Sequence, residues 1–273
     1  MNKVPQIKLA NGKYIPQIGL GLWQIKDQNE FDAAFRAAID NGYTHFDTAQ
    51  AYGNEQFLGN AWNRNNIKRE DIFITTKIQV THFTSNKLRE SFKTSLENLK
   101  TDYVDLLLLH FPVPLVRKHA WLELEKLNSS GQAKSIGVSN YMPRHIEEMD
   151  SYASQKPVIN QVELHIFLQQ PDLIKFCHER QIQIEAYSPL AHGHMPENPT
   201  ITKLMEKYNK TYAQIVLRWL VEQQIVIIPK SVTPARIAEN INIFDFKLSD
   251  DDMNEIANLN LNKRYCWSPE RIP

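Results

Sequence analysis

The sequence predicts an α/β fold, a (β/α)8 TIM barrel formed by a single domain over residues 1–273. Eight short runs rich in Val, Ile and Leu recur along the chain, and a stretch with helical spacing of apolar residues follows each run. Such continuous apolar runs are typical of parallel strands buried on both faces. Because no repeat, low-complexity tract or Ser/Gly linker interrupts the alternation, we expect one closed barrel with the helices outside.

The apolar runs give the expected strands in chain order. They are IPQIGLGLW (15–23), YTHFDT (43–48), IFITTK (72–77), VDLLLLH (104–110), AKSIGVSN (133–140), PVINQVEL (157–164), IQIEAYSP (182–189) and IVIIPKS (225–231). Before them, Asn11-Gly12 separates two shorter apolar pieces in VPQIKLANGKYIP, which predicts a β-hairpin ahead of the first barrel strand.

Two of the intervening segments show the helical pattern clearly. Apolar residues within 31–39 fall on one face, and Asn41-Gly42 supplies a C-terminal stop. The segment TYAQIVLRWLVEQQ (211–224) begins with Thr211, which we expect to cap the helix.

A doubly wound nucleotide-binding sheet is the competing architecture. Its signature is a glycine-rich turn that leads into a helix, but Gly19-x-Gly21 lacks the third glycine and runs into Trp23. The sequence also contains no P-loop, so we reject this alternative.

Composition limits the classes of partner. The 31 basic and 31 acidic residues give a net charge of zero, which provides no footprint for nucleic acid or an anionic membrane. The first residues lack the apolar core of a signal peptide, and the longest apolar run is too short to cross a bilayer. We therefore expect a cytoplasmic protein, and the patch-free composition favours a monomer.

The cysteines and the clustered histidines do not predict a metal site. Cys177 and Cys266 lie far apart and lack CxxC spacing, which indicates reduced structural thiols. The segment AHGH contains His192 and His194 without a third ligand, so a loop over a cofactor is the favoured interpretation.

Polar or aromatic groups lie in or just after seven of the eight expected strands. In strand order from the second to the eighth, they are Asp47, Lys77, His110, Asn140, Gln161, Tyr187 and Lys230. Taken singly, each is more simply a cap, a solvated charge or a structural imidazole. In a barrel, however, the carboxyl ends of the strands form one mouth, so we expect these groups to converge there.

One combination at the predicted mouth has a clear chemical use. Asp47 and Lys77 end neighbouring strands, and Tyr52 lies on the loop between them. A lysine ammonium favours phenolate and lowers the pKa of a tyrosine, while a carboxylate keeps the lysine charged. With a hydrogen bond from His110, this set fits proton transfer to the oxygen of a carbonyl that is being reduced.

Seven motifs, in order along the chain, resemble the aldo-keto reductase superfamily. They are GYTHFDTAQAYGNE, FITTK, LLLH, IGVSN, NQVELH, AYSPL and IPKSVTPARIAEN. The resemblance implies an NADPH-dependent reductase of aldehydes or ketones in which Tyr52 is the general acid, Lys77 and Asp47 tune it, and His110 orients the substrate. It also implies a cofactor that lies extended across the barrel mouth.

The resemblance further assigns residues to the cofactor. They are Ser139, Asn140 and Gln161 for the nicotinamide carboxamide, Tyr187 for stacking on the ring, Ser188 and Leu190 for the pyrophosphate, Lys230, Ser231 and Arg236 for the 2′-phosphate, and Glu239 and Asn240 near the adenine. Two cations and a hydroxyl near a helix start suit a dianionic phosphate, which favours NADPH over NADH.

The substrate pocket is expected to be formed by Trp23, Gln79, Phe111 and Trp267. Phe111 and Gln79 stand where the superfamily often has Trp, so the identity of the carbonyl substrate is left open. The short tail NKRYCWSPERIP is similar to the C-terminal substrate loop of the bacterial 2,5-diketo-gluconate reductase and prostaglandin F synthase-like group.

Two alternatives to a reductase are left open by the residues. A barrel lyase or aldolase would use Lys77 as a Schiff-base amine. A regulatory protein that binds NADPH with little activity would share the same motifs.

Overall fold

The structure is a computed structural model that describes residues 4–273. In this part of the chain the strands are β1 (Gln6–Lys8), β2 (Tyr14–Pro16), β3 (Leu20–Gly21), β4 (His45–Asp47), β5 (Phe73–Ile78), β6 (Val104–Leu109), β7 (Ala133–Ser139), β8 (Ile159–Glu163), β9 (Gln183–Tyr187) and β10 (Val226–Ile228). Strands β3 to β10 form one parallel sheet in the order β10-β9-β8-β7-β6-β5-β4-β3. Bridges from Ile18 to Ile227 and from Gly21 to Lys230 join its two edges, so the predicted barrel is confirmed.

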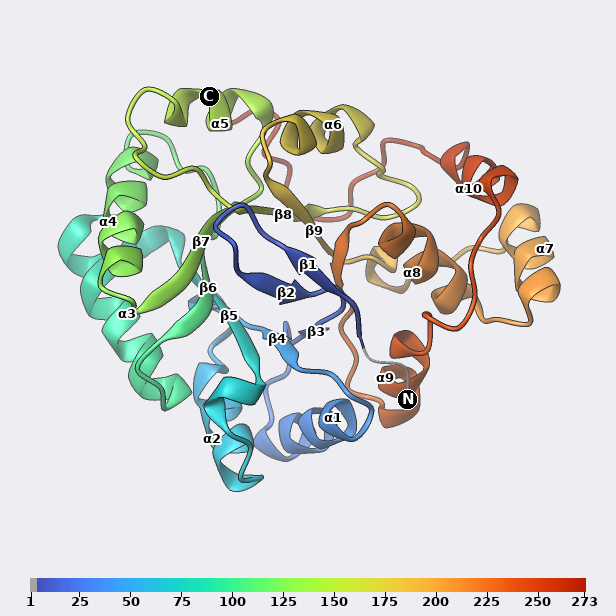
Figure 1. The fold of residues 1–273 in the computed structure, drawn as a ribbon, viewed down its shortest axis with the longest axis horizontal. Coiled ribbons are helices and arrows are strands. Elements are labelled where there is room, and N and C mark those ends of the chain that lie inside the picture. The colour runs from blue at the N-terminus through green and yellow to red at the C-terminus, as the bar shows by residue number, and fades with distance from the viewer. Residues whose placement is uncertain (1–3) are drawn as a thin grey trace.

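The helices surround the sheet (Figure 1). The α-helices are α1 (Gln28–Asp40), α2 (Glu55–Arg64), α3 (Ser85–Leu99), α4 (Arg117–Ser129), α5 (Pro143–Met149), α6 (Pro171–Glu179), α7 (Pro199–Tyr208), α8 (Tyr212–Glu222), α9 (Pro234–Ile241) and α10 (Asp250–Ala257). The two predicted helix signals are confirmed: Asn41 is the C-cap of α1, and the Thr211 hydroxyl accepts a hydrogen bond from the Gln214 backbone N–H at the start of α8.

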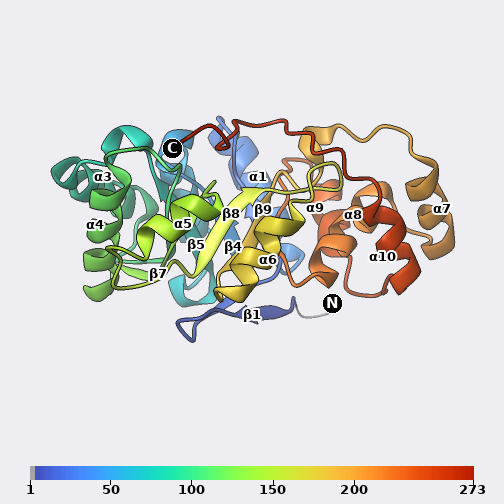
Figure 2. The same cartoon turned by 90° about the horizontal axis from the view of Figure 1, so that it is seen from above.

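The predicted hairpin is confirmed, and it takes the first part of the first apolar run. β1 and β2 pair antiparallel, with Ile7 opposite Ile15. Figure 2 shows the hairpin at one end of the barrel and the C-terminal segment running across the opposite end. Leu9 and Ile15 of the hairpin pack with Leu106 and Val226 of the barrel, so the hairpin closes the amino ends of the strands.

Strand alternation divides the barrel residues between two environments. In β6, Leu107 and Leu109 belong to the large cluster that packs against the helices, whereas Leu106 and Leu108 belong to the small cluster inside the barrel. The same alternation places Lys77 on the inside of β5. The interior is therefore apolar near the hairpin and polar toward the carboxyl ends.

The glycine pair rejected as a nucleotide fingerprint has a packing role. A Cβ on Gly21 would lie 2.8 Å from the backbone oxygen of Ile228, and one on Gly19 would lie 2.5 Å from Nδ1 of His45. A side chain at either position would push apart the two edges of the sheet or displace the buried imidazole. Gly21 is therefore explained by barrel closure, and Gly19 by the space that the buried His45 ring occupies.

Candidate active site

The predicted triad is assembled at the carboxyl ends of β4 and β5. Nζ of Lys77 lies 2.6 Å from Oδ1 of Asp47, 3.0 Å from the backbone oxygen of Thr48 and 3.4 Å from the Tyr52 hydroxyl. Tyr52 ends the short 3-10 helix η1 (Gln50–Tyr52), which follows β4 directly. The ammonium therefore has three acceptors, and the one nearest the surface is the phenol oxygen.

Burial changes the expected titration of the triad. Burial raises the pKa of the Tyr52 phenol, and the charge of Lys77 offsets only part of this rise, so the net shift is upward. The predicted net lowering of this pKa is wrong, because desolvation of the buried phenol outweighs the effect of the ammonium. Burial lowers the pKa of Lys77, but Asp47 and the other acidic groups raise it by more. At neutral pH the site therefore holds a protonated phenol beside a charged amine.

His110 follows β6 and faces the phenol. Its ring centroid lies 5.8 Å from that of Tyr52, in an edge-on arrangement. Burial and the nearby Lys77 charge lower the pKa of His110 to about 3. The imidazole is therefore neutral at physiological pH and can donate one hydrogen bond without carrying charge.

The residues assigned to the carboxamide also lie together. The Ser139 hydroxyl donates to the backbone oxygen of Gln161 at 2.9 Å and accepts from Nδ2 of Asn140 at 3.0 Å. The Tyr187 hydroxyl donates to Oδ1 of Asn140 at 2.7 Å. In the described part of the chain, no hydrogen bond is formed by Oε1 of Gln161, although this residue is only 1% exposed. A buried amide acceptor beside these groups fits the carboxamide of a nicotinamide.

The residues assigned to the 2′-phosphate surround the start of α9. Lys230 and Arg236 are exposed, and among the residues described neither forms an ion pair. The Ser231 hydroxyl accepts from the Thr233 backbone N–H at 3.1 Å, one residue before the helix begins. Two free cations at a helix N-terminus fit a dianion.

The remaining residues assigned to the cofactor differ in their exposure to solvent. Ser188 and Leu190 are half-buried in the loop after β9, and Asn240 is buried in α9. Oε1 of Glu239 accepts from the Thr211 hydroxyl at 2.5 Å. Glu239 is thus tied to the start of α8 and Asn240 is enclosed, whereas Ser188 and Leu190 keep positions that a nucleotide could contact.

The expected pocket residues lie on four different segments at the mouth. Trp23 follows β3 and is 41% exposed, with its ring edge-on to His192 at 5.2 Å. Gln79 and Phe111, after β5 and β6, are half-buried. Trp267 is 85% exposed, so the structure does not bring it against the others, and its role as a pocket wall stays a prediction.

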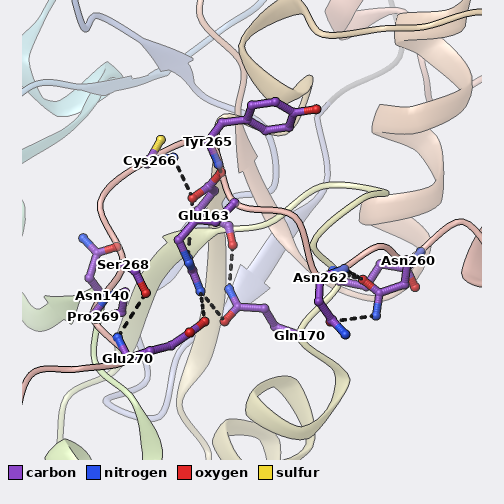
Figure 3. A network of polar contacts seen from close by, with 12 residues as sticks. Asn140, Glu163, Gln170, Asn260, Asn262, Tyr265, Cys266, Ser268, Pro269 and Glu270 are labelled. Atoms are coloured by element: carbon purple, nitrogen blue, oxygen red, sulfur yellow. Dashed lines mark hydrogen bonds and ion pairs between the residues drawn. The ribbon is translucent and has the colours of Figure 1, made fainter.

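The C-terminal segment is held across the mouth by a buried carboxylate, Glu163 (Figure 3). Its two oxygens accept from the backbone N–H groups of Tyr265 at 2.6 Å and Cys266 at 3.1 Å. The ring of Tyr265 stacks on His194 at 4.5 Å, and Nε2 of His192 lies 3.0 Å from Sγ of Cys266. The AHGH loop therefore packs against the C-terminal segment, and the described residues contain no group of side chains suited to a metal ion.

Two carboxylates of the site, Glu163 and Glu185, are not among the residues expected from the sequence. Both are completely buried, on β8 and β9. The available signal was an acidic residue within an apolar strand, because a buried carboxylate needs a partner.

A further finding is that no helix in residues 4–273 combines the length and apolar character required to cross a membrane.

The mouth of the barrel brings together a protonated phenol, a paired lysine and a neutral imidazole. Beside them lie polar groups spaced to hold a nucleotide cofactor. This combination defines an oxidoreductase of carbonyl compounds. The Aldo/keto reductase family model matches residues 17–261, and the chain belongs to this family. It is an NADPH-dependent reductase of aldehydes or ketones, so the predicted family, cofactor and reaction class are confirmed.

The similarity to individual proteins extends over almost the whole chain. The chain is 41% identical to the glyoxal reductase of Bacillus subtilis (strain 168) over 266 residues, which is 97% of this chain and 96% of the relative. It is 42% identical to the methylglyoxal reductase DkgA of Escherichia coli O157:H7 over 270 residues, 97% of each. The structure of a Bombyx mori aldo-keto reductase (AKR2E4) in complex with NADP has a TM-score of 0.90 at 32% identity, covering 97% of this chain and 95% of that one.

Proposed function

We propose that this enzyme reduces small 1,2-dicarbonyl compounds such as glyoxal and methylglyoxal, with Tyr52 as the proton donor. The relatives named for these substrates are 41–42% identical and match 97% of the chain. The observation that carries the role of Tyr52 is its hydroxyl 3.4 Å from the ammonium of a fully buried lysine. A carbonyl carbon next to a second carbonyl is also electron-poor, which makes it a good hydride acceptor.

The residues divide the chemistry between them. When bound, NADPH supplies the hydride. Tyr52 gives its proton to the carbonyl oxygen, and the Lys77 ammonium stabilises the phenolate that remains. Asp47 holds Lys77 through a contact of 2.6 Å. The neutral ring of His110 donates a hydrogen bond to the same carbonyl oxygen, which increases its negative charge as the reaction proceeds.

The cofactor is held by three groups of residues in this proposal. Asn140 and Gln161 bind the carboxamide with Ser139, and Tyr187 supports the ring. Lys230 and Arg236 bind the 2′-phosphate with Ser231. Ser188 and Leu190 lie against the pyrophosphate, and Asn240 lies near the adenine.

The Schiff-base alternative is not favoured by the environment of Lys77. A Schiff base needs a neutral, accessible amine. The side chain of Lys77 is only 1% exposed, is paired with Asp47, and has a raised pKa. Borohydride should therefore trap no carbonyl compound on this lysine. A regulatory protein with little activity is also disfavoured, because the four catalytic positions are all occupied by residues able to do the chemistry.

Replacing Tyr52 by Phe tests the proton donor. General acid catalysis contributes roughly 10²–10⁴-fold, so kcat for methylglyoxal should fall by at least about 100-fold. The Kd for NADPH, measured by quenching of protein fluorescence, should stay within about twofold of the wild-type value. Tyr152→Phe is the matched control: this half-buried tyrosine has a hydroxyl without a partner in the described residues, so kcat should be unchanged. Normal turnover by Tyr52→Phe would refute the assignment.

A substrate series tests the dicarbonyl class separately. The specificity constant kcat/KM should be higher for glyoxal and methylglyoxal than for propanal and acetone, with NADPH oxidation followed by its absorbance. If a simple aldehyde is the better substrate, the dicarbonyl proposal fails while the reductase assignment stands.

We also propose that the enzyme is a monomer in the cytoplasm. Two cysteines that are not joined by a disulfide support the cytoplasm, and the patch-free composition permits a monomer. Light scattering during gel filtration would give the mass, and a value near twice 31.8 kDa would contradict the monomer.

A further inference from the structure

A second carboxylate, Glu185, lies beside the catalytic ion pair inside the barrel. It stands directly opposite Gln161 in the pairing of β8 with β9, and both residues are buried. Nε2 of Gln161 lies 2.9 Å from Oε2 of Glu185 and 2.8 Å from Oδ2 of Asp47. One amide nitrogen thus joins two carboxyl groups that come from different sides of the barrel.

This arrangement decides which way the amide of Gln161 faces. An amide nitrogen carries two protons, and here each has its own carboxyl acceptor. Turning the amide over would place Oε1 against the charged oxygen of Asp47, where two acceptors would repel each other. Oε1 must therefore be the atom left for a ligand, and it forms no hydrogen bond within the described part of the chain.

We propose that Glu185 is a positioning residue that, together with Asp47, fixes the Gln161 amide so that Oε1 accepts a hydrogen bond from the carboxamide NH2 of the cofactor. This inference rests on the proposed contact between Gln161 and the carboxamide. It adds a residue that touches neither substrate nor cofactor. It also gives Asp47 a second task, because its other oxygen already holds Lys77.

The groups that face Glu185 agree with this role. From β4, Nε2 of His45 lies 3.7 Å from Oε1 of Glu185, and burial lowers the pKa of this histidine to about 3, so it is neutral. From β5, Lys77 is already paired with Asp47. Burial, together with the charge of Asp47, raises the pKa of Glu185 to about 8. At neutral pH Glu185 is therefore a protonated acid that accepts through Oε2 without adding a second negative charge.

The test compares ligands with and without the nicotinamide. Glu185→Leu removes the acceptor, and loss of one oriented hydrogen bond should raise the Kd for NADPH roughly tenfold. The Kd for 2′-phospho-ADP-ribose, which has no nicotinamide, should stay within about twofold. Glu185→Gln keeps an acceptor in the same place and should restore the wild-type Kd for NADPH.

A matched control and three outcomes make the test decisive. Glu125→Leu removes another buried carboxylate, which binds Trp121 and two backbone N–H groups outside the barrel interior, and it should not change the ratio of the two Kd values. Equal weakening of both ligands by Glu185→Leu, no weakening at all, or a Glu185→Gln variant as weak as Glu185→Leu would each overturn the proposal.

A second measurement covers the case in which Glu185→Leu does not fold. The acetylpyridine analogue of NADP⁺ carries a methyl group where the carboxamide has its NH2 donor. Wild type and Glu185→Gln should both bind it at least about fivefold more weakly than NADP⁺. Equal affinity for the two dinucleotides would overturn the proposal even if NADPH still binds and turns over. A wild type that binds NADPH no better than 2′-phospho-ADP-ribose would instead reject the nicotinamide site itself, and this inference with it.

Discussion

Replacing Lys77 by Met should destabilise the protein by an amount that depends on pH. The substitution keeps an unbranched apolar chain and removes the ammonium that lies 2.6 Å from Oδ1 of Asp47. Asp47 is only 2% exposed, so it is left as a buried carboxylate without its cation. Breaking a buried ion pair in this way typically costs about 3–5 kcal/mol.

The pH sets an upper limit to this cost. A stranded Asp47 can bind a proton instead of remaining charged, and each pH unit above its unfolded pKa of about 3.9 makes that uptake cost about 1.36 kcal/mol. The limit is therefore about 4 kcal/mol at pH 7 and about 1.5 kcal/mol at pH 5. Because the folded pKa is raised, the variant binds more protons folded than unfolded, and its stability falls as the pH rises.

The assay is urea unfolding without cofactor, followed by circular dichroism at pH 5, 6 and 7. The difference in unfolding free energy between wild type and Lys77→Met should grow by about 2–3 kcal/mol from pH 5 to pH 7, with unchanged m-values. The double variant Asp47→Asn/Lys77→Met has no buried carboxylate left without its cation, so its difference from wild type should vary much less with pH than that of the single variant. A constant difference for the single variant would refute the reasoning.

Three further predictions concern the cofactor and the helical shell. Arg236→Ala should raise the Kd for NADPH about tenfold and leave that for NADH within about twofold, since only NADPH has the 2′-phosphate; equal effects would argue against a phosphate site. Gly59→Ala places a Cβ 2.1 Å from the backbone oxygen of Asn98 and should lower the melting temperature by several degrees, because the α2–α3 contact must open; an unchanged value would contradict the packing argument. Asp252→Asn should lower the melting temperature most at pH 6–7 and progressively less below about pH 4. Hydrogen bonds to Asp252, first from Lys207, outweigh the effect of burial and lower the pKa of this carboxyl. The stabilisation by Asp252 is therefore present above its unfolded pKa and is lost in acid. A difference that grows in acid would contradict this sign.

The barrel could be predicted from sequence because its strands carry a local signal. An apolar run such as VDLLLLH predicts a strand that is buried on both faces. Eight such runs with helices between them fit a barrel, in which the interior buries one face of each strand and the helices bury the other. The exact first strand could not be predicted, since residues 15–23 form one unbroken run, of which only Leu20–Gly21 is a barrel strand and Ile18 adds a single bridge to Ile227. Where the hairpin ends and the barrel begins depends on pairing with Gln6–Lys8, which no local pattern contains.

The site shows the same division between local and long-range information. The position of Lys77 at a strand end is local, and its meeting with Asp47 follows from the order of neighbouring strands. The net pKa of Tyr52 was predicted in the wrong direction, because desolvation depends on everything packed around the phenol. Glu185 was missed because its partner Gln161 reaches Asp47 across the barrel, over 114 positions of sequence.

Charge balance and access to water together favour the mouth of the barrel as the place of the proposed proton transfer. The polar part of the barrel interior, here called the polar layer, contains two carboxyl groups, Asp47 and Glu185, and one cation, Lys77. Because His45 and His110 are neutral, a proton on Glu185 leaves the layer without net charge, which limits the cost of burying it. Any group that then loses a proton must regain it from water. Tyr52 is half-buried, whereas Asp47 and Lys77 are at most 2% exposed, so the phenol is the member of the triad that can be reprotonated between turnovers.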